Sequence, residues 1–307
     1  IDGNSILNRA FYGTQNSFLK NAEGLYTGAL FGFMNIYLKQ AEELRPEYAA
    51  VAFDVKAPTF RHERYTEYKA GRKGMPEELA MQFPIVKELI DAMGISRIEL
   101  PGYEADDILG TYARIATENH LICYIMTGDR DALQLVNENV HVLLCSTQKG
   151  RPQTDEYDIE TVKQKYGVLP PQLIDVKALM GDASDNIPGV PGVGEKTASA
   201  LISEYGSLDE VYAHVEEIKK AALQTKLKEN KELAYLSRFL GEIETHAPAE
   251  QQLADSPQQG RAYPLEIRLC QRIVPQQEHE GQRHLLVRHE EQAQQAHRAV
   301  GRQGHRP

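Results

Sequence analysis

The sequence has few cysteines and lacks a long apolar run, and both features exclude classes of protein. Its 307 residues hold three cysteines, Cys123, Cys145 and Cys270, and no CxxC pair. This excludes a disulfide scaffold and a cysteine-ligated zinc site, and it fits a reducing compartment. No apolar run approaches the roughly 18 residues of a membrane span, and no basic and apolar leader opens the chain. We therefore expect a cytoplasmic protein with no membrane partner.

Basic residues are also outnumbered by acidic residues. The chain carries 34 basic and 44 acidic residues, a net charge of -10. This argues against a nucleic-acid binder held mainly by basic charge, unless some of the acids have a special role. Hydrophobic residues make up 41% of the chain and charged residues 25%, which are ordinary values for a globular protein. A chain of this length can bury a core without disulfides.

The composition changes near residue 250. Residues 251–307 hold 12 Gln and 8 Arg but no Lys, and they show no sustained period of 2 or 3.6 residues. A disordered linker is one interpretation of this low-complexity tail. Translation out of frame is a second interpretation, because the tail lacks lysine and is enriched in arginine and glutamine. An RNA-binding tail is a third, although RGG-type repeats are lacking.

Strand-length apolar runs alternate with helical patterns in residues 1–150. Helices are expected at 27–43, 77–93 and 104–118, and strands at Tyr48–Phe53, Leu121–Met126 and Val140–Cys145. This alternation predicts an α/β domain with a parallel sheet and helices on both faces. We interpret Ile1 and Asp2 as the end of a first strand whose body lies before residue 1.

The pattern changes after residue 150, and no strand is expected beyond Cys145. Helical patterns cover residues 159–166, 171–180, 196–205 and 223–240. We therefore predict an α/β domain over 1–150, a helical domain over 151–250 and a low-complexity tail over 251–307.

Nine acidic residues occupy positions that the predicted fold brings together. Some follow strand-like runs, and the carboxyl ends of the strands line the site in open α/β sheets. Others open a helix or stand three residues apart in the helical part, where capping or turn formation is the ordinary alternative. The nine are Asp2, Asp54, Glu104, Asp106, Asp107, Asp129, Asp131, Asp182 and Asp185.

Together these acids predict a metal site. Nine converging carboxylates would repel one another unless cations lay among them, and hard oxygen ligands select Mg²⁺ or Mn²⁺. Two such ions, about 3.5–4 Å apart, activate a water and stabilise both oxygens of an in-line phosphoryl displacement. The acids therefore predict hydrolysis of phosphodiesters.

Two further segments carry the signature of DNA contact. The run GVPGVGEKTA at 189–198 is a helix-hairpin-helix signature, in which the glycines bring backbone N–H groups close to a phosphate and Lys196 adds charge. Such a hairpin grips the DNA backbone and not the base edges; a plain turn between helices is the alternative. The insert at 60–73 interleaves basic residues with Tyr65 and Tyr68, which suits a single strand. Its alternative is a solvated helix face.

Five segments together resemble the 5′-nuclease (flap endonuclease) family, and most closely its 5′→3′ exonuclease domains that are fused to bacterial polymerases. The segments are IDGNS, FRHERYTEYKAGR, YEADD, TGDRDALQL and MGDASDNIPGVPGVGEKTA. The resemblance covers about residues 1–250. It implies a PIN-like α/β nuclease core, a helical arch over about 56–80 and a helix–three-turn–helix for duplex DNA. Nothing after residue 250 resembles a polymerase.

The resemblance also implies roles for individual residues. The nine acids fall on the metal-site acids of the family, with Asp129 among the catalytic residues, and Lys69 and Arg72 fall on the arch cations that steady the scissile phosphate. The hairpin of the family can hold K⁺ on backbone carbonyls. The residues expected to contact DNA are Arg61, Arg64, Tyr68, Lys73, Gly192, Gly194 and Lys196.

The implied substrate is DNA with a 5′ flap, a nick or an RNA primer end, cut in primer removal, nick translation and repair. The implied protein is a bacterial, nucleoid-associated monomer with no obligate protein partner. A stand-alone 5′-nuclease is the first rival. A module that holds branched DNA without cutting is the second, and it would require metal ligands to be lost. A PIN-type ribonuclease would explain the acids but not the hairpin at 189–198.

Overall fold

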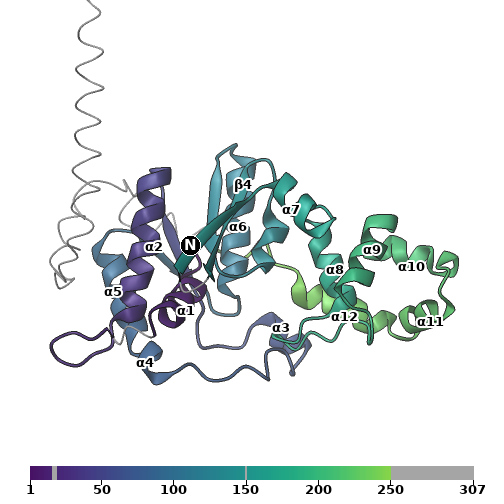
Figure 1. Ribbon diagram of the computed structural model, residues 1–307, viewed down its shortest axis with the longest axis horizontal. Coiled ribbons are helices and arrows are strands. Elements are labelled where there is room, and N and C mark those ends of the chain that lie inside the picture. The colour runs from purple at the N-terminus through teal and green to yellow at the C-terminus, as the bar shows by residue number, and fades with distance from the viewer. Residues whose placement is uncertain (16–18, 149–150, 250–307) are drawn as a thin grey trace, which may run out of the picture. The chain divides into compact units, whose positions relative to one another are not determined.

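The computed structural model describes residues 1–15, 19–148 and 151–249 (Figure 1). The three interpretations of the tail at 251–307 lie outside the described residues. No helix in the described part is long and apolar enough to cross a membrane.

A parallel sheet forms the centre of the first part. Strands β1 (Ala50–Phe53) and β2 (Ser96–Glu99) pair in parallel, as do β3 (Cys123–Thr127) and β4 (Val140–Gln148). These are the three predicted strands and one further short strand. Only Ile98 is buried in β2, so the periodicity there was too weak to reveal a strand.

The first two residues join the two pairs of strands. The Asp2 N–H donates to the Met126 carbonyl over 2.9 Å, and the Ala52 N–H donates to the Ile1 carbonyl over 2.9 Å. Ile1 and Asp2 therefore lie between β1 and β3, where the interpretation as a strand end places them.

A fifth strand corrects the expectation that no strand follows Cys145. Strand β5 (Arg151–Tyr157) pairs antiparallel with β4 at the edge of the sheet. Its sequence, RPQTDEY, is polar and contains a proline, as edge strands tolerate, so it lacks the apolar pattern of a central strand. The sheet thus continues past residue 150, where we expected the α/β part to end.

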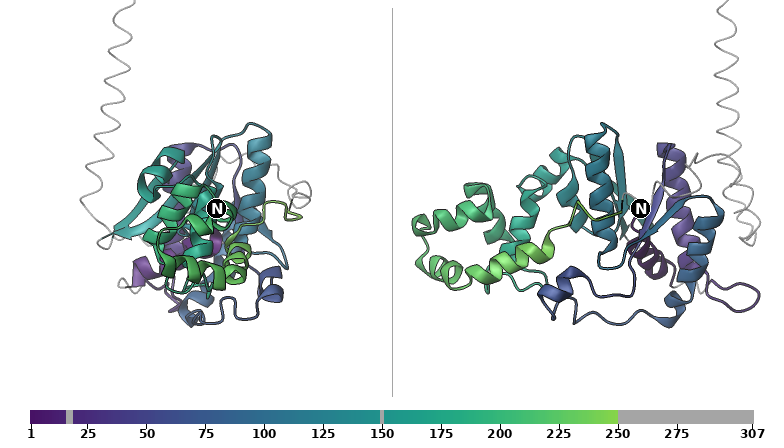
Figure 2. Two further views of the ribbon diagram at one scale, coloured as in Figure 1. Left: turned by 90° about the vertical axis from the view of Figure 1, so that its right-hand side faces the viewer. Right: turned by 180° about the vertical axis from the view of Figure 1, so that it is seen from behind.

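Helices cover both faces of the sheet, as predicted. Helices α1 (Gly3–Thr14), α2 (Gly28–Leu44) and α5 (Gln82–Ala92) lie on one side, and α6 (Ala105–Glu118) lies on the other (Figures 1 and 2). The predicted helix at 77–93 is divided at Met81 into α4 (Glu77–Ala80) and α5.

The expected helical arch is mostly irregular. Between β1 and α4 the chain forms one short helix, α3 (Phe60–Arg64), followed by turns and extended segments (Figure 1). Gly71, Gly74 and Pro76 follow in quick succession, and each disfavours a helix. Beyond the helical hydrogen bonds of α3, the arch is held by turns and by contacts such as the Lys69 N–H, which donates to the Asp185 carbonyl over 2.9 Å.

The second part is helical and has its own core. Its helices enclose a buried cluster that includes Leu179, Ile202 and Leu227. The predicted helix at 223–240 is divided at Asn230. The helices are α7 (Ile159–Tyr166), α8 (Gln172–Met180), α9 (Glu195–Tyr205), α10 (Leu208–Ala213), α11 (Ala221–Glu229) and α12 (Lys231–Gly241).

Residues after α12 return to the sheet part. The Gln134 side chain donates to the Gly241 carbonyl over 3.1 Å and accepts from the Ile243 N–H over 2.9 Å. Ala249 is fully buried in the core beneath α6. This return fixes α8 and α12 beside the carboxyl ends of the strands.

Candidate active site

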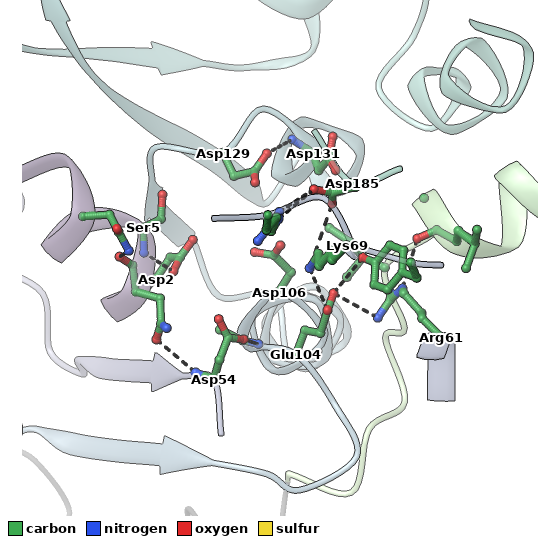
Figure 3. Close-up of a pocket in the computed structure, with 18 of the residues that line it drawn as sticks. Asp2, Ser5, Asp54, Arg61, Lys69, Glu104, Asp106, Asp129, Asp131 and Asp185 are labelled. Atoms are coloured by element: carbon green, nitrogen blue, oxygen red, sulfur yellow. Dashed lines mark hydrogen bonds and ion pairs between the residues drawn. The ribbon is translucent and has the colours of Figure 1, made fainter. Parts of the chain in front are cut away.

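The predicted acids converge on a cavity of about 480 Å³ at the carboxyl ends of the strands (Figure 3). They reach it from the strand ends, from the start of α6 and from the turn after α8. The acids that line the cavity are Asp2, Asp54, Glu104, Asp106, Asp129, Asp131 and Asp185.

Neutral donors hold the strand-end carboxylates in place. Asp2 caps α1 by accepting from the Ser5 N–H over 2.9 Å, and it accepts from the Thr127 hydroxyl over 2.7 Å. Asp54 accepts from the Ala105 N–H over 2.7 Å, at the start of α6. These bonds orient the carboxylates without neutralising their charge.

Cations of the protein neutralise only some of the acids. The Lys69 ammonium lies 2.6 Å from Glu104 and 3.9 Å from Asp185, and Arg72 also pairs with Asp185. Within the described part of the chain, no cation pairs with four acids of the cavity. These are Asp2, Asp54, Asp106 and Asp129.

The pKa values of unpaired acids such as Asp2 and Asp106 are raised. Burial, with the neighbouring charges of Asp54 and Asp129, raises the pKa of Asp2 to about 6, against the opposing hydrogen bonds. Burial and the charges of Asp2 and Asp129 also raise the pKa of Asp106, whose Oδ1 has no hydrogen-bond partner. An orphaned buried carboxylate oxygen beside like charges is what a hard divalent cation fits.

A second group of acids lies beside the first. Carboxylate oxygens of Asp131, Asp182 and Asp185 all lie within 4.8 Å of one another. The Lys177 ammonium is 2.8 Å from Asp182 and pairs with Asp131. Asp182 does not line the cavity itself. Asp131 and Asp185 belong to this group and also line the cavity.

Sequence reasoning missed Lys177. Its side chain is buried, and although burial alone would lower its pKa, the ion pair with Asp131 raises it. A signal existed in the sequence, since Lys177 interrupts the apolar residues of α8, and Val176, Ala178 and Leu179 are all buried. A lysine in such a place needs a carboxylate partner.

Asp107 does not fit its predicted role as a metal ligand. It is fully buried and lies outside the cavity lining. Both of its oxygens accept from the Arg61 guanidinium over 2.8 Å, and they also accept from the backbone N–H groups of Glu104 and Glu244 over 2.9 Å. Its hydrogen-bonding capacity is therefore used within the protein.

Arg61 and Tyr68, which we predicted to contact DNA, both line the cavity, but their side chains are largely buried and their polar groups bond to other residues of the protein. Besides Asp107, the Arg61 guanidinium donates to the carbonyls of Leu240 and Glu242 over 3.1 Å and 2.6 Å. The Tyr68 hydroxyl donates to Glu104 over 3.1 Å. These side chains anchor the base of the arch.

The other predicted cations of the arch remain accessible. Lys73 lines the cavity and is exposed, and Arg64 is exposed on α3. Lys69 and Arg72 also line the cavity, close to the acids. The turn that carries Lys69 is tied to the second group of acids, because the Lys69 N–H donates to the Asp185 carbonyl over 2.9 Å.

The hairpin at 189–198 joins α8 to α9. Gly189 and Gly192 adopt positive φ angles of 62° and 77°, which favour glycine. Gly192, Gly194 and Lys196 are exposed, and no side chain caps the start of α9. The hairpin therefore presents free N–H groups and a cation to solvent, as the prediction of a phosphate contact requires.

The fold and the site define a metal-dependent nuclease: seven carboxylates line a cavity at the carboxyl ends of a parallel sheet, and four of them have no cation partner among the described residues. Residues 1–167 match the family described as 5′-3′ exonuclease, N-terminal resolvase-like domain. Residues 168–263 match 5′-3′ exonuclease, C-terminal SAM fold. The chain belongs to this 5′-3′ exonuclease family, which confirms the predicted family, fold class and class of enzyme.

Two curated relatives of the chain are DNA polymerases. The chain is 45% identical over 255 residues to DNA polymerase I of Caldicellulosiruptor bescii and 44% identical over 260 residues to DNA polymerase I of Bacillus subtilis. These matches cover 83% and 85% of the chain but only 30% and 29% of the relatives. The chain thus spans less than a third of their length.

Solved structures show the same fold at low identity. The T5 5′-exonuclease with bound divalent zinc has a TM-score of 0.63 at 22% identity, over 82% of this chain and 91% of that one. The flap endonuclease of bacteriophage T5, in a pseudo-enzyme–product complex with DNA and metal ions, has a TM-score of 0.63 at 22% identity, over 84% and 92%.

Proposed function

We propose that this chain is a structure-specific 5′→3′ exonuclease and flap endonuclease that hydrolyses DNA phosphodiesters. Its substrate is DNA with a 5′ flap, a nick or an RNA primer end. The observation that carries the proposal is the set of four cavity carboxylates without a cation partner, next to an exposed helix-hairpin-helix. The T5 relative is described with both DNA and metal ions, which supports the same ligands here.

We further propose that the two groups of acids hold two Mg²⁺ or Mn²⁺ ions. Asp2, Asp54, Asp106 and Asp129 would hold one, and the group of Asp131, Asp182 and Asp185 would hold the other. Bound ions of this kind supply an activated water and stabilise charge on the attacking and leaving oxygens. The carboxylates orient this chemistry through the hydrogen bonds that fix them.

The arch cations would bind the scissile phosphate. Lys69 and Arg72 now pair with Glu104 and Asp185 at the rim of the acids. A substrate phosphate that enters the cavity would accept hydrogen bonds from Lys69 and Arg72 in place of these carboxylates. Such charge-assisted bonds to the phosphate oxygens would stabilise the transition state. Arg64 and Lys73, which are exposed, would hold the single strand.

The hairpin would hold the duplex arm of the substrate. The N–H groups at the start of α9 and the Lys196 ammonium suit a backbone phosphate, so binding would follow DNA shape and not sequence. We also assign to the hairpin the K⁺ ion that backbone carbonyls can hold. In the cell, the chain would act as the nuclease part of a bacterial DNA polymerase I, in the cytoplasm at the nucleoid, as a monomer with no obligate protein partner.

The test compares two isosteric substitutions on a 5′-flap substrate in Mg²⁺. Asp129→Asn removes a carboxylate of the cavity, and we expect cleavage to fall on the order of 10²–10³-fold, the scale of losing one electrostatic contact at the reacting centre. Asp158→Asn removes the same charge from an exposed cap of α7, where asparagine caps equally well, and cleavage should not change. Equal turnover by both variants would contradict the assignment.

A further inference from the structure

Helix α11 places an unassigned lysine directly over the hairpin. A Cβ built on Gly192 would collide with the Lys226 ammonium and would lie 3.6 Å from Cε and 4.0 Å from Cδ of the same side chain. Lys226 therefore reaches from one helix across to the exposed turn that opens another. Helices α9 and α11 lie at the same end of the helical part (Figure 1).

The neighbour of Lys226 anchors helix α11 in the core. Leu227 is fully buried in the same core as Val190 and Val193, the two valines of the hairpin. The shared core and the approach of Lys226 to Gly192 place α11 close to the hairpin. The Lys226 side chain itself is exposed, with its ammonium near Gly192.

No residue in the described part of the chain forms an ion pair with this ammonium. Among the described residues, Lys226 has no carboxylate partner and no hydrogen-bond acceptor for its side chain. Lys228, two residues later on the same helix, does have one, because it pairs with Glu216. Residues two apart lie on nearly opposite faces of a helix, so the two lysines face different surroundings.

We propose that Lys226 is a second phosphate-binding cation of the hairpin, so that the duplex arm is held by α11 as well as by the start of α9. Its ligand is a backbone phosphate of duplex DNA, read without regard to base sequence. This inference rests on the proposed function, since it needs the hairpin to contact the duplex. The inference gives the Lys226 ammonium, which lies near Gly192, a role in the contact between the hairpin and the duplex.

The experiment measures affinity against salt concentration, in EDTA, for a flap substrate with a long duplex arm. For Lys226→Gln we expect the slope of log affinity against log salt to fall by about 0.9 and the affinity to fall by about five-fold. Lys226→Arg should restore the slope. Lys228→Gln removes the same charge from the opposite face and should leave both quantities unchanged, because its partner is Glu216.

Each outcome decides the question. Equal losses for Lys226→Gln and Lys228→Gln would overturn the proposal, because they would show only a general effect of charge. A lower melting temperature for Lys226→Gln with an unchanged salt slope would also overturn it, because Lys226 would then stabilise the turn. Cleavage of the flap by the wild-type chain in Mg²⁺ tests the proposed function separately, so the two failures can be told apart.

Discussion

Asp106 and Asp107 are adjacent in the sequence but serve different purposes. Asp106 faces the cavity with an unsatisfied oxygen, whereas Asp107 is enclosed by Arg61 and two backbone N–H groups. Spacing alone could show that both open a helix and could not show which faces the sheet edge. That distinction depends on Arg61, which lies 46 residues away in the sequence.

Removing the Asp107 carboxylate should therefore cost stability. Asp107→Ala leaves the buried Arg61 guanidinium without its partner, which costs about 3–5 kcal/mol. For a folded region of this size, we expect the melting temperature to fall by about 6–20 °C, or the chain to be lost to aggregation. Asp107→Ala that melts like the wild type but does not cut in Mg²⁺ would restore Asp107 to the metal site.

Lys69 should act on the rate more than on binding. Its ammonium lies at the edge of the acidic cluster, 2.6 Å from Glu104. From there it can stabilise the negative charge that develops on a phosphate in the transition state. We expect Lys69→Ala to slow single-turnover cleavage by about 10²–10³-fold and to change substrate affinity little. Lys73→Ala removes an exposed cation that forms no ion pair with any described residue; it is the matched control and should weaken binding. The reverse pattern would make Lys69 a plain phosphate contact.

At the scale of elements, the sequence was informative wherever an apolar period was strong. The three apolar strands and α2, α6, α7, α8 and α9 lie within a few residues of their predicted bounds. Edge strands β2 and β5 were missed because they bury little, and the breaks at Met81 and Asn230 were missed because the helical period continues across them. The arch was expected to be helical, yet its shape depends on contacts with Glu104 and Asp185.

The hairpin glycines should separate folding from binding. Gly189 has a positive φ, and a Cβ there would lie 2.6 Å from the Met180 carbonyl carbon, so Gly189→Ala should destabilise the fold by more than 1 kcal/mol or so. At Gly194 a Cβ meets nothing, so Gly194→Ala should fold normally. A methyl group where a phosphate approaches the helix start should still weaken binding to a long duplex arm.

The measurements are thermal unfolding and affinity for flap substrates with a long and a short duplex arm. Gly194→Ala should lose affinity for the long arm only. If it loses affinity equally for both, the hairpin is not a separate clamp for the duplex. If Gly189→Ala melts like the wild type, the tight packing of the hairpin against the end of α8 does not contribute to the stability of the fold.

At the scale of the whole molecule, charge organises the fold. The net charge of -10 looked unfavourable for a DNA-binding protein, but seven of the 44 acidic residues line a single cavity. The sequence allowed this inference because the acids follow strand ends. It could not show that Lys177, Lys69 and Arg72 would neutralise one part of the cluster and leave the other part unpaired. The unpaired part is where we propose that a divalent cation binds.

Divalent cations should therefore stabilise the whole fold. The unpaired carboxylates repel one another in the folded state, and a ligand bound only to that state at 100 times its Kd adds about 2.7 kcal/mol. We expect Mg²⁺ to raise the melting temperature by about 5–11 °C at constant ionic strength. NaCl at the same ionic strength, which only screens the charges, should raise it less.

Asp106→Asn provides the sharper control. The substitution keeps the shape but removes a half-buried charge with no cation partner, so the metal-free protein should melt at a higher temperature than the wild type. The same substitution removes a proposed ligand, so the gain from Mg²⁺ should shrink. Wild type and variant would thus change order between EDTA and Mg²⁺. A variant that melts below the wild type in EDTA and gains as much from Mg²⁺ would show that internal hydrogen bonds, and not metal, hold the acids together.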